Sequence, residues 1–355
     1  MKQSKSPRKD ACRKILAWFN GMIGVLPLCN FHFLHLNMFK NAIIYKIAPG
    51  WDAQMTPIEA CLQTNQFVEC GPSQELSLGW VPPRGQPNGP MLESVAGQWI
   101  LKLMIESRNV PATVLNRKAA ERVAQIEAST GRKPGKKEAR EIKEDLLHEL
   151  LPLAFTQQSS VLMWINRADL FVLIDAASIA QADEVATLLV KTLPGLALQL
   201  VSTQLAPATA MADWLVTQEA PAGFSVDRDC ELKAADESKA VVRYTRHRLD
   251  TDEVKQHIAN GLLPVSLAMT WCDRVSFVLT EGLQLKKLAF LDGVFEGGSQ
   301  DHDFDADVAI ATGELCKLLP DVLDALGGET GQNATPAANS NADGDTNLNA
   351  NPCQS

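Results

Sequence analysis

The sequence predicts an α+β fold with mixed or antiparallel sheets. Apolar runs of strand length and stretches of helical periodicity follow one another without the regular strand–helix alternation of parallel α/β proteins. Hydrophobic residues make up 46% of the 355 residues, which is enough for a substantial core, and no internal repeat of fixed period is present. A chain of this length forms one large domain or two to three modest ones.

The first half of the chain predicts strands and helices on both sides of a central helical region. Residues 161–165 and 170–175 are apolar runs separated by a polar turn sequence, which is typical of a β-hairpin. Residues 71–90 are rich in Gly and Pro and predict a loop. The expected strands cover 38–47, 99–106, 161–165, 170–175 and 196–201, and the expected helices cover 57–64 and 178–193.

Two amphipathic helices joined by a tight turn are expected within residues 111–153. Gly131 is typical of the end of the first helix, Pro134 and Gly135 of the turn, and Pro152 of the end of the second helix. The two apolar stripes consist of Leu115, Ala119, Val123 and Ile126, and of Ala139, Ile142, Leu146 and Leu150.

This helical region is strongly basic in an acidic chain. Between Arg117 and Lys143, nine Lys or Arg residues stand against four Glu, whereas the whole chain has a net charge of −9 and a pI near 5.3. That balance argues against a uniformly basic nucleic-acid coat, but it allows a basic groove on an acidic body. Because acids alternate with the bases, a solvated pair of salt-bridged helices is the alternative.

The second half predicts a further set of helices and strands. A helix over 205–221 tolerates Pro207 in its first turn, and a helix over 251–261 has Thr251 in the N-cap position and Gly261 after its end. The other expected elements are strands at 240–248, 263–270, 275–280 and 285–290 and a last helix at 307–326.

The expected strand at 240–248 carries a second basic group. Side chains alternate between the faces of a strand, so Arg246 and Arg248 would share one face, and Arg243 and His247 the other. Such a strand suits phosphate binding, but a charged edge strand that prevents aggregation is the alternative.

Few residues point to catalysis. The eight Cys form no CxxC pair or zinc-type spacing, which favours a reduced cytoplasmic setting, and no phosphate loop, GxGxxG, GxSxG or HExxH motif occurs. Asp301, Asp303, Asp305 and Asp307 could ligate a hard cation, which leaves a metal-dependent hydrolase as an alternative. Asp305 and Asp307 also suit the positive end of the dipole of the last helix.

Composition and pattern divide the chain into five parts. A basic start followed by a broken apolar run predicts an upstream extension over 1–37 that is disordered or not native, with Met38 as a second candidate start. The end of the chain has almost nothing to bury and predicts a disordered tail over 328–355. The other parts are a central α/β part (38–110 with 154–204), a helical tip (111–153) and a C-terminal base domain (205–327).

Several short motifs resemble the RdgC family of recombination-associated bacterial proteins. The similarity covers about residues 38–328 and is closest over 130–152. One departure is Leu153, where family members commonly carry Arg. The motifs are Met38-Phe39-Lys40-Asn41, Gly79-Trp80-Val81-Pro82-Pro83, Met163-Trp164-Ile165, Phe304-Asp305-Ala306-Asp307 and Thr312-Gly313-Glu314-Leu315.

The resemblance implies a cytoplasmic, nucleoid-associated protein that binds duplex DNA without sequence specificity. It implies a ring-forming homodimer with a protruding helical hairpin, which encircles DNA and restrains RecA-dependent recombination, with no catalysis, cofactor, metal or membrane. We expect a subunit contact at Phe155, for which core packing is the alternative. A protein-binding adaptor of the recombination machinery, using the tip as a partner helix pair, is a further alternative. The expected DNA-binding residues are Arg132, Lys133, Lys136, Lys137, Arg140, Arg243, Arg246 and Arg248.

Overall fold

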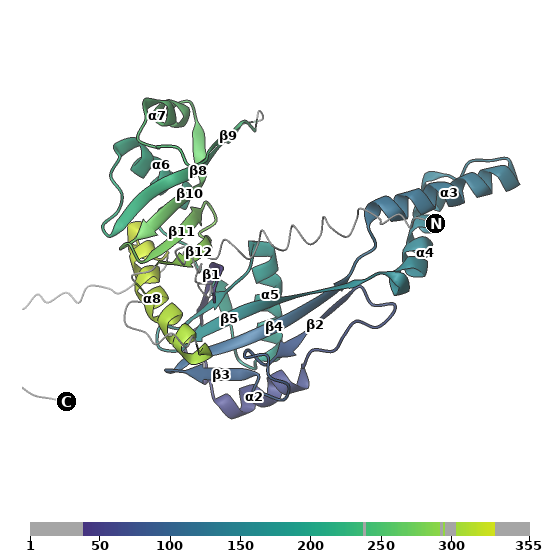
Figure 1. Ribbon diagram of the computed structural model, residues 1–355, viewed down its shortest axis with the longest axis horizontal. Helices are drawn as coiled ribbons and strands as arrows, with labels where there is room; N and C mark the ends of the chain where they lie inside the picture. The colour runs from purple at the N-terminus through teal and green to yellow at the C-terminus, as the bar shows by residue number, and fades with distance from the viewer. Residues whose placement is uncertain (1–37, 237–238, 292–293, 295–302, 331–355) are drawn as a thin grey trace, which may run out of the picture. The chain divides into compact units, whose positions relative to one another are not determined.

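The computed structural model describes residues 38–236, 239–291, 294 and 303–330 (Figure 1). The extension expected over 1–37 and nearly all of the tail expected over 328–355 lie outside these residues. The described helices are α2 (Met55–Thr64), α3 (Ala112–Thr130), α4 (Lys136–Leu150), α5 (Ile179–Thr192), α6 (Pro207–Thr217), α7 (Asp252–Ala259) and α8 (Phe304–Ala325).

The described strands form one twelve-stranded antiparallel sheet, so the predicted α+β class is confirmed. Its order is β2-β4-β5-β6-β1-β12-β11-β10-β8-β9, with β3 paired to β4 and β7 paired to β1. The strands are β1 (Asn41–Ile47), β2 (Leu76–Val81), β3 (Leu92–Val95), β4 (Gln98–Arg108), β5 (Thr156–Asn166), β6 (Phe171–Ile174), β7 (Leu198–Leu200), β8 (Phe224–Ala234), β9 (Val241–Tyr244), β10 (Leu262–Trp271), β11 (Val275–Thr280) and β12 (Leu285–Phe290).

β4 is buried on both faces along much of its length, which explains its nearly continuous apolar sequence. Trp99, Leu101 and Leu103 belong to the core cluster that includes buried residues of α2 and α5. Ile100 points to the other face and belongs to the cluster that includes buried residues of α8 and of the C-terminal strands. Alternation of side chains across one strand therefore builds two cores, one on each side of the sheet.

β2 lies where the Gly and Pro content predicted a loop. Leu76–Val81 pairs with β4, and Trp80 is fully buried, with its Nε1 donating to Thr192 Oγ1 at 3.2 Å. Gly79 permits this arrangement because a Cβ there would lie only 2.2 Å from the Cα of Phe67. The glycine therefore marks a close approach of two backbones, and the loop prediction is wrong for this segment.

Two strands of the C-terminal half also differ from the prediction. No element is predicted over β8, because charged residues interrupt its apolar pattern. β9 ends at Tyr244, whereas the predicted strand continued to residue 248. The strand cannot continue because Arg246 has a φ of +53°, in the left-handed region, and its amide donates to the carboxylate of Asp229 at 2.7 Å.

The contacts at the start of β1 explain the Phe39-Lys40-Asn41 motif that was noted in the sequence. The carboxylate of Asp175 accepts hydrogen bonds from the backbone amides of Lys40 and Asn41 at 3.2 and 2.8 Å, and from the side-chain amide of Asn41 at 3.1 Å. Phe39 is fully buried beside Trp164. The Phe39-Lys40-Asn41 motif thus fixes the start of β1.

Candidate nucleic-acid interface

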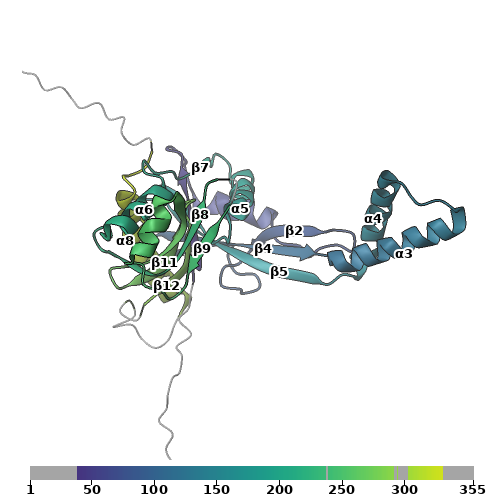
Figure 2. The same ribbon diagram turned by 90° about the horizontal axis from the view of Figure 1, so that it is seen from above.

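α3 and α4, which are joined by a short turn and are here called the hairpin, follow β4 and precede β5 (Figure 2). Gly131 ends α3 with a φ of +69°, as expected for a glycine C-cap. The helices are held together by polar contacts as well as by their apolar stripes. Arg122 lies 3.4 Å from Glu149, and Lys143 Nζ donates to Asn116 Oδ1 at 2.9 Å.

Three of the five predicted bases in the hairpin form ion pairs with neighbouring glutamates. Arg132 contacts Glu138 at 3.1 Å across the turn, Lys137 lies 3.8 Å from Glu141, and Arg140 lies 2.9 Å from Glu144. All three basic side chains are strongly exposed, and such surface pairs contribute little to stability. These arginines and lysine therefore stay within reach of an external anion.

The other two predicted bases are unpaired. Lys133 lies in the turn before α4 and Lys136 is its first residue, and both side chains are exposed. In the part of the chain that the structure describes, neither side chain forms a hydrogen bond or an ion pair. Within the described residues, the positive charges of these two ammonium groups are therefore not neutralised by an acidic partner.

Arg108 anchors the hairpin where β4 ends. Its Nη1 donates to the carbonyl oxygens of Leu151 and Pro152 at 3.5 and 3.3 Å, and its Nη2 donates to that of Cys70 at 3.4 Å. Beside it, the buried carboxylate of Glu106 accepts from the Cys70 amide, and this hydrogen bond holds the pKa of Glu106 below its ordinary value. The returning chain at Leu151 and Pro152 is therefore tied to the end of β4 by the Arg108 guanidinium.

Two exposed apolar residues, Leu153 and Phe155, lie where the hairpin returns to the sheet and are here called the apolar step. Phe155 is 96% exposed and Leu153 is 78% exposed, so the alternative of core packing for Phe155 is wrong. Two large apolar side chains this exposed and this close together are unusual on a surface in contact with water, and they are typical of a contact with another molecule.

The second predicted group of bases does not lie on one strand as expected. Its members are Arg243, Arg246 and Arg248. Only Arg243 lies on β9, where it is paired with Glu231 of β8 through two hydrogen bonds of 2.8 and 3.4 Å. Arg246 and Arg248 follow the strand, so the expected division between two strand faces is wrong. Arg248 forms two bonds to Asp250, at 3.0 and 2.5 Å, which hold the pKa of that carboxyl below its ordinary value.

Sequence reasoning missed one basic residue of this region. Arg228 lies on β8, is exposed, and lines the same cavity as Arg248. Its side chain has no hydrogen bond or ion pair within the described residues. The prediction missed it because β8 itself was not predicted, and an isolated arginine between two aspartates carries no signal of its own.

The acidic residues proposed for a metal site have other partners. Asp305 pairs with Arg84, which also contacts Glu93 at 2.9 Å and lies over the ring of Phe304. Asp305 and Asp307 lie in the first turn of α8, as the dipole interpretation predicted. Within the described residues, which exclude Asp301, no three His, Cys, Asp or Glu side chains are grouped to hold a metal ion.

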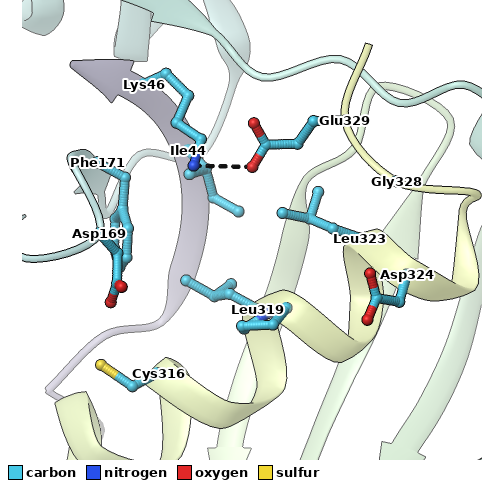
Figure 3. A pocket seen from close by; sticks show the side chains of 11 residues that line it. Ile44, Lys46, Asp169, Phe171, Cys316, Leu319, Leu323, Asp324, Gly328 and Glu329 are labelled. Atoms are coloured by element: carbon cyan, nitrogen blue, oxygen red, sulfur yellow. Dashed lines mark ion pairs between the residues drawn. The ribbon is translucent and has the colours of Figure 1, made fainter. Parts of the chain in front are cut away.

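A cavity of about 270 Å³ beside α8 has the wrong charge for phosphate (Figure 3). Of the residues that line it, Lys46 is the one base, and its ammonium group contacts the Glu329 carboxylate at 2.8 Å. Asp169 and Asp324 add negative charge, and the remaining lining is largely apolar. An anionic ligand would be repelled there, so this cavity does not extend the candidate interface.

Comparisons with known proteins agree with the pattern of motifs. The family model described as "RdgC: Putative exonuclease, RdgC" matches residues 38–329. A protein named Recombination-associated protein RdgC from Dechloromonas aromatica is 42% identical over 299 residues, which are 82% of this chain and 98% of that protein. Proteins of the same name from Bordetella pertussis and Cupriavidus necator are each 43% identical, with 82% of this chain and 98% of the relative covered.

None of the described helices is both long enough and apolar enough to cross a bilayer.

Proposed function

Since the chain belongs to the RdgC family of recombination-associated proteins, we propose that it binds duplex DNA without sequence specificity, as a homodimer that encircles the helix. A dimer bound in this way would limit the access of RecA to DNA in the nucleoid. The family membership supports the link to recombination, and the charge distribution supports the mode of binding.

The observation that carries this proposal is the unbalanced charge of the α3–α4 hairpin. Residues 131–140 hold five bases and one acid in a chain whose net charge is −9. Lys133 and Lys136 have no acidic partner within the described residues. Exposed ammonium groups of this kind attract the phosphate backbone of any sequence and carry no means of reading base edges.

The exposed apolar step at Leu153 and Phe155 supports a contact between two copies of the chain. Aromatic side chains are enriched at the centres of subunit contacts, where they are fully removed from water. A contact at the root of each hairpin would bring the basic segments of two subunits close to one DNA helix. This proposal places Phe155 at the subunit contact and the hairpin bases at the phosphates.

The test is equilibrium binding of the full chain to two duplexes of unrelated sequence, measured over a range of salt concentrations. We expect equal affinities and a linear fall of log K with log salt, with a slope of about −0.9 for each phosphate contact. Sizing of the protein by sedimentation should give a dimer. A strong preference for one duplex, or binding that salt leaves unchanged, would refute the proposal.

The same reactions separate the two alternatives. For a metal-dependent hydrolase, added Mg²⁺ or Mn²⁺ should lead to degradation of the duplex, and purified protein should retain a bound cation. For a protein-binding adaptor, capture of a recombination protein should survive complete digestion of DNA by an added nuclease. Intact DNA in the first test and loss of capture in the second are the results that the DNA-binding proposal predicts.

A further inference from the structure

A second hollow in the structure lies in the C-terminal part, away from the hairpin segment of the chain. This cavity of about 460 Å³ is enclosed by α6, by the segment after it, by β8 and by the loop that follows β9. Its volume is within the usual range of small-molecule sites. The lining residues are Trp214, Leu215, Gln218, Ala220, Val226, Asp227, Arg228, Arg248, Leu249 and Asp250.

A large bulge in β8 brings polar side chains to this cavity. β10 pairs Leu267 with Cys230 and Met269 with Val226, so residues 227–229 of β8 lie opposite Ala268 alone. The bulged backbone is held by the next loop, since the His247 amide donates to the carbonyl oxygen of Arg228 at 3.0 Å. Bulges of this kind redirect side chains and are over-represented beside functional sites.

The polar lining offers donors and acceptors in equal measure. The side chain of Arg228 has no partner within the described residues, and the Arg248 side chain is bonded to Asp250. Asp227 accepts one hydrogen bond, from Thr270 Oγ1 at 2.9 Å, which leaves acceptor positions on its carboxylate. The formal charge of these lining residues is zero, with two arginines and two aspartates.

The apolar lining includes an aromatic ring. Trp214 is 9% exposed and lines the cavity from α6. Leu215 and Leu249 are buried beside it in the same cavity.

From this combination we infer that the cavity binds a nucleotide, with the heterocyclic base against the Trp214 side of the cavity and the phosphate on Arg228. A flat heterocycle carries both donors and acceptors on its edge, which matches the balanced polar lining better than a simple anion does. The unpaired guanidinium supplies the charge that an adjacent phosphate requires. A base within a nucleic acid and a free nucleotide offer the same chemical groups to this cavity. The inference rests on the proposed DNA binding in the first case and is independent of it in the second.

The first measurement compares two single strands of about 12 nucleotides on the full chain, one normal and one composed of abasic residues. The two carry the same phosphate charge, so any difference reports contact with bases. We expect the normal strand to bind about tenfold more tightly, which is within the range reported for one stacked base. Equal affinity of the two strands, with no binding of a free nucleotide, would overturn the inference.

Variants then assign that difference to this cavity. Ala220→Phe should fill the cavity and abolish the difference between the two strands. Arg228→Gln should weaken both strands alike, because it removes a phosphate contact. Lys191→Gln, which removes an exposed charge from α5, is the matched control and should change neither value. A difference between strands that survives in Ala220→Phe, in protein with an unaltered melting curve, would place the base elsewhere and refute the site.

A final competition experiment distinguishes a free nucleotide from a base within a nucleic acid as the ligand. A nucleoside monophosphate that binds alone and competes with the strand identifies a site for free nucleotides. A strand that discriminates without such competition identifies a base within a nucleic acid. Titration of duplex DNA in parallel keeps the two proposals distinct, because Ala220→Phe should bind duplex as the wild type does whether or not the cavity binds a base.

Discussion

Lys133 and Lys136 provide the sharpest test of how the hairpin contacts DNA. Their side chains are exposed and have no acidic partner within the described residues, unlike Arg132, Lys137 and Arg140. The double variant Lys133→Gln/Lys136→Gln removes two positive charges without freeing a buried group. Because neither lysine packs in the core, we expect the free energy of unfolding to change by less than about 0.5 kcal/mol.

The expected size of the effect on DNA binding follows from counterion release. Each phosphate contact contributes about 0.9 to the slope of log K against log salt, so two lost contacts should reduce the slope by about 1.8. At a salt concentration of about 0.15 M this corresponds to a loss of affinity of roughly thirtyfold. Fluorescence anisotropy with a labelled duplex, repeated at several salt concentrations, measures both quantities.

A matched control has the same net charge but leaves the hairpin intact. Lys40→Gln/Lys191→Gln removes two exposed lysines from the start of β1 and from α5. We expect its salt slope to stay within about 0.3 of the wild-type value, because a distant charge acts only through the screened field of the whole protein. If the control and the hairpin variant lose equal affinity, or if neither slope changes, the assignment of the hairpin lysines to phosphate is refuted.

Three further predictions concern the fold, the subunit contact and the dependence on pH. Gly79→Ala should lower the free energy of unfolding by about 3 kcal/mol in a urea titration, since the new Cβ would lie 2.2 Å from the Cα of Phe67, and a near-normal stability would contradict the backbone contact. Phe155→Ser should weaken the dimer by about thirtyfold in sedimentation while leaving monomer stability nearly unchanged, because the ring is 96% exposed, and an unchanged dimer would exclude it from the contact. Hydrogen bonds from Arg274 hold the pKa of Glu314 below its ordinary value of 4.5, so its contribution to stability is present above that value and is lost as pH falls through the lower folded-state pKa. Glu314→Gln should therefore flatten the acid limb of the stability curve, and an unchanged limb would contradict this role.

Much of the hairpin could be predicted because its signals are local. Helical periodicity, a glycine stop at Gly131 and the i,i+4 spacing of Lys137 with Glu141 and of Arg140 with Glu144 lie within a few residues of one another. The pair between Arg132 and Glu138 depends on how the turn folds and was not predicted. Local sequence therefore indicates where charge accumulates, and the fold decides which charges remain free.

The C-terminal basic group could not be predicted for the opposite reason. The end of β9 depends on the left-handed backbone of Arg246 and on the carboxylate of Asp229, which comes from a neighbouring strand. The position of Arg228 depends on a bulge that is defined only by pairing with β10. These are contacts between segments distant in sequence, and no periodicity within β8 or β9 records them.

The exposed step at Phe155 shows the same limit in a single residue. An aromatic residue flanked by apolar neighbours is usually a core residue, and local sequence alone left both core packing and a subunit contact open for Phe155. The anchoring of Leu151 and Pro152 by Arg108 precedes this step and brings the chain from the end of α4 back toward the sheet. Its exposure therefore follows from the tertiary structure of the hairpin root.

Encirclement of DNA by a dimer is tested most directly by a comparison of closed and cut circles. The full chain is loaded on a covalently closed plasmid at low salt, the salt is raised above the level that releases electrostatic contacts, and half of the sample is then cut once. A ring predicts that protein remains on the closed circle and is lost from the cut molecules by sliding off the ends. Release from closed and cut DNA at the same rate would contradict a ring and would leave only an open electrostatic contact.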